Sequence, residues 1–181
     1  MKKGAKKIKI DKIYLIFVRY IILLGFVLSL PIIYKVLTPL TLYPVKWLLE
    51  LIYENIAISK NIISINGTSL VELIPACIAG SAYLLLLILN LSVSMNVKKR
   101  IYSILSSFLI LLILNILRIF FLIILYHNES PFFDITHKLF WYGLSTVFVV
   151  GIWFLEVKKF SIKETPVYSD IKYFVKEIKI K

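Results

Sequence analysis

The chain has 181 residues, a net charge of +12 and a hydrophobic content of 60%, above the roughly 45–50% of an ordinary globular domain. This composition excludes a disordered chain and disfavours a soluble single-core domain, because the apolar residues form long runs. Only 18% of the residues are charged, so the lysines and arginines are concentrated in a few segments. Cys77 is the one cysteine, which excludes an intramolecular disulfide, and we expect no metal and no cofactor.

The N-terminal segment combines a basic arm with an apolar run. Residues 1–12 contain six lysines, and residues 13–33 are apolar apart from Arg19. A secretory signal peptide has the same order of charge and hydrophobicity, but its apolar region is shorter and precedes a cleavage site of small residues. We therefore predict a basic cytoplasmic arm over 1–12 and a retained transmembrane helix over 13–33.

The segment 36–60 mixes apolar residues with charges. Three of its charged side chains are spaced by four residues, so they share one face of a helix, which is typical of an amphipathic helix in the membrane interface. Beyond it, Ile62–Leu73 has strand character, and its Asn66–Gly67 pair predicts the turn of a short external hairpin. The three charged residues are Lys46, Glu50 and Glu54.

Three further apolar runs follow, over residues 73–95, 101–126 and 138–155. Each is long enough to cross a bilayer core of ~30 Å. Together with the first run they predict an all-α integral membrane protein, a bundle of four transmembrane helices with an external segment between the first and second spans. Residues 13–156 then form one transmembrane domain that carries the functional residues, and 157–181 form a basic cytoplasmic tail.

The distribution of lysine and arginine predicts the orientation of these spans. The N-terminal arm, the linker 96–100 and the tail together hold sixteen of these residues, whereas the segments on the other side hold four. Cytoplasmic loops of membrane proteins carry the excess of positive charge. Both termini and the linker are therefore expected in the cytoplasm, and residues 34–72 and 127–137 outside the cell membrane.

Three reactive residues are expected at one depth near the external boundary. Counted from the cytoplasmic ends of their spans at ~1.5 Å per residue, Cys77 and His137 lie about 28 Å up and Arg118 about 26 Å up. Each alone has a simpler interpretation, as a packing cysteine, a snorkelling arginine or an interfacial histidine. Asn115 lies three residues before Arg118 on the same helix face, and polar groups there indicate a face turned to the protein interior. Nothing fixes the position of His127, which makes it the weaker histidine candidate.

The chemistry of these residues is consistent with nucleophilic catalysis. Cys77 follows Pro75 and is expected to open a helix, where free backbone N–H groups favour a thiolate. His137 can take the thiol proton and return it to a leaving group, and Arg118 or Asn115 can bind an oxyanion. The small residues after the cysteine, Gly80 and Ser81 among them, allow a substrate or a neighbouring helix to come close.

The order of these residues resembles the pattern of the exosortase/archaeosortase family. The matching segments are Pro75–Gly80 (Pro-Ala-Cys-Ile-Ala-Gly), Asn115–Ile119 (Asn-Ile-Leu-Arg-Ile) and His137 at the start of the last span. The resemblance covers residues 70–156 and fits the small, archaeosortase-like core form of the family. Many members have Cys-Ser/Thr-Gly, whereas here the glycine comes one residue later, which leaves the subfamily open.

This resemblance implies a membrane-embedded cysteine transpeptidase with Cys77, Arg118 and His137 as its catalytic residues and Asn115 as a supporting one. Family members process exported proteins that end in a short motif, a transmembrane helix and a basic tail. The enzyme would cleave near the motif on the outer face, hold the substrate as a thioester and transfer it to an acceptor that is lipid-linked. The implied partners are these proteins, the acceptor and the membrane.

Three alternatives come from other classes of protein. A non-catalytic membrane assembly factor or scaffold would tolerate the loss of the Cys77 thiol. A small transporter or channel subunit would need polar residues along a path through the membrane, and the inner halves of the spans offer few beyond serines and Arg19. Nucleic-acid binding is not needed to explain the positive charge, because cytoplasmic orientation and attraction to anionic lipids account for it. The sequence does not identify the substrate, the acceptor, the source or the oligomeric state.

Overall fold

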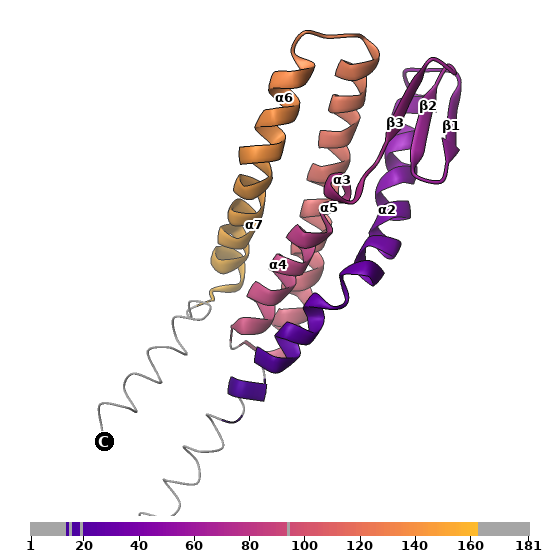
Figure 1. Cartoon of the computed structure of the whole chain (residues 1–181). Helices are drawn as coiled ribbons and strands as arrows, with labels where there is room; N and C mark the ends of the chain where they lie inside the picture. Colours follow the sequence, from indigo (N-terminus) through magenta and orange to yellow (C-terminus); the bar gives the residue numbers. More distant parts are fainter. Residues whose placement is uncertain (1–13, 15, 19, 94, 163–181) are drawn as a thin grey trace, which may run out of the picture.

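The computed structural model describes residues 14, 16–18, 20–93 and 95–162 of the chain. The predicted arm over 1–12, Arg19 and the part of the tail from residue 163 onward lie outside the described residues. The described part is mostly helical and contains one small β-sheet. Figure 1 shows the helices side by side along one direction, with the sheet at one end of the molecule.

The first helical part of the chain is bent. Residues Ile16–Val27 and helix α2, Leu30–Glu50, meet at an angle of 55°. Helix α2 contains Pro39 and Pro44, each of which lacks the N–H that would continue the helical ladder. By length and composition the bent pair can form one broken membrane span.

The predicted interfacial helix over 36–60 is only partly correct. Lys46 and Glu50 do share a helix face, with 3.3 Å between Nζ and Oε1, but the helix ends at Glu50 and does not include Glu54. The opposite face of α2 carries a buried stripe at every fourth residue, and this stripe packs against α4 and α5. The helix therefore runs along the bundle, because its apolar stripe and not its charged face decides its position. The stripe consists of Leu37, Thr41, Val45 and Leu49.

A small β-sheet occupies one end of the fold (Figure 1), in the region that we predicted as a hairpin. Strands β2, Ile62–Ile65, and β3, Ser69–Glu72, pair in antiparallel fashion. Asn66 and Gly67 have backbone φ of 51° and 70°, so the predicted turn is confirmed. Sequence analysis missed a third strand, β1, Ile56–Ser59, which pairs with β2 to give the order β1-β2-β3.

The predicted second span over 73–95 is wrong as a single helix. The chain forms a one-turn helix α3, Pro75–Ile78, and then α4, Gly80–Ser92, with Ala79 in the left-handed conformation between them (φ 59°, ψ 31°). A residue in this conformation ends a right-handed helix. At ~1.5 Å per residue α4 extends about 20 Å, which is shorter than a bilayer core of ~30 Å. Hydropathy does not reveal the break, because Ala79 is as apolar as its neighbours.

Helix α5, Val97–His127, contains the predicted third span and extends beyond it at both ends. The predicted linker 96–100 therefore belongs largely to the first turn of this helix. The helix supplies the largest share of the tertiary packing, since it contacts α2, α4, α6 and α7. Its buried residues recur every four positions along one face, at Ser103, Ser107, Leu111, Asn115, Ile119 and Ile123.

The last helical stretch is continuous from Phe133 to Phe160, so it starts earlier than the predicted span 138–155. It consists of α6, Phe133–Leu139, a π-helical turn η1, Phe140–Leu144, and α7, Ser145–Phe160. This stretch and α5 are the two helices in the described part of the chain that are individually long and apolar enough to cross a membrane. The turn between α5 and α6 lies at the same end as the sheet, and the turn between α4 and α5 lies at the opposite end (Figure 1).

Candidate active site

Cys77 lies in a short, well-defined piece of backbone between the sheet and the bundle. Pro75 begins α3, where its missing N–H costs nothing, and the Cys77 N–H donates to the Ile74 carbonyl at 2.8 Å. Ala79 then ends the turn in the left-handed conformation. Cys77 therefore lies in the first turn of a helix, as predicted, but this helix ends after one turn and the longer helix begins only at Gly80.

Gly80 and Ser81, the small residues predicted to support the site, have different surroundings. Gly80 is buried, and a Cβ at this position would lie 2.5 Å from the ring of Tyr34 on α2. The glycine therefore permits the close packing of α2 against the start of α4. Ser81 is exposed, and neither residue lines the cavity that contains Cys77.

Two side chains of α5 hold the backbone of the cysteine segment. Asn115 Nδ2 donates to the Cys77 carbonyl at 3.0 Å and to the Ile78 carbonyl at 3.4 Å. Arg118 Nη2 donates to the same Cys77 carbonyl at 3.0 Å. The spacing of three residues places both donors on one face of α5, as the sequence predicted. Asn115 is buried and does not line the cavity, so its contacts position the cysteine segment.

Arg118 also connects the cysteine segment to the last helix. Its Nη1 donates to Ser145 Oγ at 2.8 Å, and Ser145 Oγ donates to the Phe140 carbonyl at 2.6 Å across the π-helical turn. The Arg118 Nε is buried and has no hydrogen-bond partner among the described residues. One guanidinium thus contacts two elements with two of its five N–H donors.

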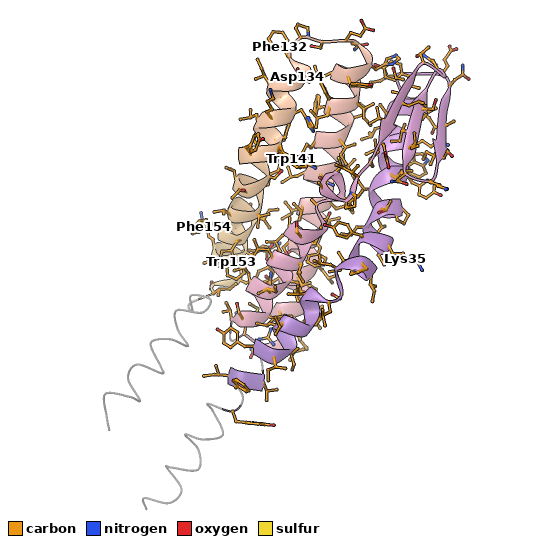
Figure 2. All side chains as sticks on the ribbon, in the orientation of Figure 1. Lys35, Phe132, Asp134, Trp141, Trp153 and Phe154 are labelled. Atoms are coloured by element: carbon orange, nitrogen blue, oxygen red, sulfur yellow. The ribbon has the colours of Figure 1, made fainter. Side chains whose placement is uncertain are left out.

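His137 lies on the face of α6 that carries aromatic residues. Its ring stacks on Phe133, with 5.4 Å between centroids and 15° between planes, and meets the edge of Trp141 at 6.1 Å. The three residues are spaced by four and so lie on one side of the helix. Figure 2 shows Trp141 on this helix between Phe132 and Asp134 near its start and Trp153 and Phe154 near its end.

One cavity brings the three predicted catalytic residues together. It has a volume of about 300 Å³ and is lined by Cys77, Arg118 and His137. The rest of its wall is mostly apolar and comes from β3 with the segment after it, from α5 and from the aromatic face of α6 and η1. Three segments far apart in the sequence thus contribute a thiol, a guanidinium and an imidazole to one pocket.

The other histidine has a different environment. His127 ends α5, and its Nδ1 lies 2.8 Å from Ser69 Oγ, in a hydrogen bond that joins the helix to β3. Its ring also meets Tyr53 edge to face, with 4.7 Å between centroids. His127 does not line the cavity, and its contacts hold the sheet against the bundle.

A second polar cluster, which sequence analysis missed, lies at the opposite end of the bundle. Glu156 is fully buried, with its two carboxylate oxygens 2.9 Å from Ser103 Oγ and 2.8 Å from Ser106 Oγ. Ser103 Oγ also lies 2.6 Å from Oδ1 of the fully buried Asn90. The sequence signal was present, because Asn90 and Ser103 interrupt apolar runs, but it gave no sign that they meet. Within the described residues, no three His, Cys, Asp or Glu side chains gather to hold a metal ion.

Comparison with known proteins adds a family to this geometry. The model of the family described as Transmembrane exosortase (Exosortase_EpsH) matches residues 11–156. The chain belongs to the exosortase family. The matched range contains Cys77, Arg118 and His137 and ends at Glu156 of the second polar cluster. Searches of curated proteins and of solved structures gave no significant match. Exosortase membership and the apolar helices together identify a membrane protein, and the family is generally one of sorting-related cysteine peptidases or transpeptidases.

Proposed function

We propose that this exosortase-family protein is a cysteine transpeptidase that cleaves the C-terminal sorting signals of exported proteins and transfers the exported part to an acceptor. The observation that carries the proposal is the single cavity lined by Cys77, Arg118 and His137. A nucleophile, a base and a cation that converge on one concave site form the arrangement that acyl transfer requires.

The proposed reaction has two acyl-transfer steps, and His137 carries the proton in both. His137 takes the proton of the Cys77 thiol, and the sulfur attacks the carbonyl carbon of the scissile peptide bond. As the C–N bond breaks, the protonated His137 gives its proton to the leaving amine, and a thioester remains on Cys77. A hydroxyl or amine of the acceptor then attacks the thioester and gives its proton to His137, and the Cys77 thiolate leaves.

Arg118 is proposed to stabilise the oxyanion of each tetrahedral intermediate. Arg118 lines the cavity with Cys77, and its bonds to the Cys77 carbonyl and to Ser145 Oγ use two of its five N–H donors and hold it in place before the substrate arrives. Asn115 is proposed as a positioning residue, because it bonds the backbone of the cysteine segment and not the cavity.

The proposed topology has four crossings, with both termini in the cytoplasm and the cavity at the external face. The first crossing is the bent pair Ile16–Val27 and α2, and the second is α3 with α4. The other two are α5 and the continuous helix Phe133–Phe160. Lys98, Lys99 and Arg100 lie at the end opposite the sheet, and the positive-inside rule places that end in the cytoplasm.

Reporter fusions test this topology. A fusion at Ser59, in the sheet, should report an external location, and a fusion at Asn96, between α4 and α5, should report the cytoplasm. Ser59 and Asn96 lie on opposite sides of the membrane only if α3 and α4 together cross it. Reports from the same side would contradict the proposed second crossing.

The proposed substrate class is an exported protein that ends in a short motif, an apolar helix and a basic tail, and the proposed acceptor is lipid-linked. Co-expression of the chain with such proteins from its own source tests the activity. Wild type should shift the substrate to a shorter form on a gel, and Cys77→Ala should not. If substrate processing is the same with Cys77→Ala, the protein is a scaffold or assembly factor instead.

A further inference from the structure

Strand β3 leaves one of its edges unpaired within the described residues. It is the last strand of the sheet, and β2 occupies its other edge. The Leu73 N–H donates to the Asn61 carbonyl at 2.8 Å, which makes these two residues a hydrogen-bonded pair of the antiparallel ladder. Because such pairs alternate along a strand, the N–H and C=O groups of Val71 also face β2, and those of Leu70 and Glu72 face away from it.

This free edge borders the cavity that contains Cys77. Successive side chains of a strand point to opposite faces, so a cavity beneath a sheet contacts every second residue. Here the cavity is lined by all five residues from Leu70 to Ile74, which come from both faces. A single cavity reaches both faces of a strand only around its edge. The outward-facing backbone groups of Leu70 and Glu72 therefore lie beside the same space as the thiol.

We propose that an extended segment of the substrate polypeptide binds by adding a fourth strand to the free edge of β3. This proposal rests on the proposed function, because it assumes that a peptide bond must reach Cys77. Alternating N–H and C=O groups are complementary to a polypeptide backbone. The apolar and aromatic walls of the cavity suit the side chains of an apolar segment.

The end of the free edge sets the register of the bound segment. The Ile74 carbonyl already accepts the Cys77 N–H, so strand pairing can extend no further than Ile74. The segment then leaves β3 directly at the turn that holds the cysteine. Peptide residues a few positions from the scissile bond pair with Glu72 and Leu70, and pairing uses every second peptide residue.

The test needs a cleaved peptide, which a selection supplies. The probe is an exported reporter with eight randomised residues before an apolar helix and a basic tail, co-expressed with the full wild-type chain. The randomised segment of a cleaved reporter is then synthesised as a peptide and offered to the purified full chain in detergent. Each backbone nitrogen of this peptide is methylated in turn, which removes one N–H donor and leaves the side chain unchanged.

Strand addition predicts an alternating pattern in this scan. Methylation at two positions separated by one residue should each reduce kcat/KM by about fivefold or more, the effect of one lost hydrogen bond. Methylation of the residue between them should have at most about a twofold effect. A scan without alternation would overturn strand addition but leave the proposed function intact. If wild type cleaves no reporter, the proposed function and this inference both fail.

A substitution in β3 provides an independent measurement. Leu70→Pro removes an N–H that faces the cavity and not β2, and proline is tolerated at such edge positions. We expect a rise in KM of about fivefold relative to Leu70→Ala, which also removes the leucine side chain beyond Cβ but keeps the N–H. Labelling of the Cys77 thiol should be equal in both variants if both are folded. Equal KM values in two folded variants would overturn strand addition, and the peptide scan decides the case if Leu70→Pro does not fold.

Discussion

The molecule has two polar clusters, one at each end of the bundle. They differ in how many hydrogen bonds their side chains form with one another. In the cluster of Asn90, Ser103, Ser106 and Glu156, each polar side chain contacts another across α4, α5 and α7. In the cavity cluster, Cys77 and His137 line the cavity without a hydrogen bond to another side chain among the described residues, and Arg118 bonds the Cys77 carbonyl and Ser145 Oγ. A closed network holds helices together, whereas an open one beside a cavity is available to a ligand.

The largest expected effect is at the nucleophile. Cys77→Ser should leave no detectable cleavage while the chain remains folded, because a serine hydroxyl is scarcely ionised near pH 7. Cleavage on a gel and thermal unfolding in detergent measure the two properties separately. Substantial turnover by Cys77→Ser would mean that the open cluster is not the reacting centre.

The two histidines form a matched pair for the next prediction. His137→Ala should reduce kcat/KM by about 10²–10⁴, because the general acid and base is lost. His127→Ala should change it little and should mainly weaken the contact between α5 and β3, which thermal unfolding measures. The reverse order of effects would show that the cavity does not identify the catalytic histidine.

Arg118→Lys should reduce kcat by about 10² although the charge is retained. A lysine ammonium cannot hold the Cys77 carbonyl and Ser145 Oγ in the planar geometry of a guanidinium and also present a third donor. Ser145→Ala is the matched control, since it removes one of these contacts, and it should cost about fivefold. A fully active Arg118→Lys would contradict an oxyanion role.

The smallest expected effect on activity is in the closed cluster. Glu156→Ala should lower the free energy of unfolding by about 1–3 kcal/mol, because it removes two hydrogen bonds of a fully buried side chain. Glu156→Gln, which keeps the size and one acceptor oxygen, should cost less. Cleavage per folded molecule should equal that of wild type in both variants. Loss of cleavage without loss of stability would mean that the closed network has a catalytic role.

The sequence predicted which residues meet at the cavity better than it predicted the backbone conformation around Cys77. Helical periodicity and run length sufficed for α5, and the Asn66–Gly67 pair sufficed for the hairpin turn. The rise argument assumed one continuous helix through Cys77, which the left-handed Ala79 contradicts. The cysteine still lines a cavity with Arg118 and His137, because Asn115 and Arg118 hold its carbonyl from α5.

Other features had no readable signal in the sequence. The position of α2 along the bundle depends on which of its two faces packs against other helices. The sequence of α2 alone does not identify those helices. The meeting of Asn90 with Glu156 through Ser103 depends on the relative rotation of three helices, which local patterns do not fix. The π-helical turn that brings Ser145 toward Arg118 is likewise a product of tertiary packing.

The most direct test of the central claim is the detection of the acyl intermediate. Cys77 is the only cysteine of the chain, so a thioester formed by the wild-type protein can have only one location. Full-length protein from cells that co-express a cleaved substrate is analysed by mass spectrometry before and after hydroxylamine treatment. A hydroxylamine-sensitive substrate adduct on Cys77, enriched when the acceptor is depleted, is the expected result. Substrate cleavage without any adduct on Cys77, under conditions that deplete the acceptor, would contradict a cysteine transpeptidase.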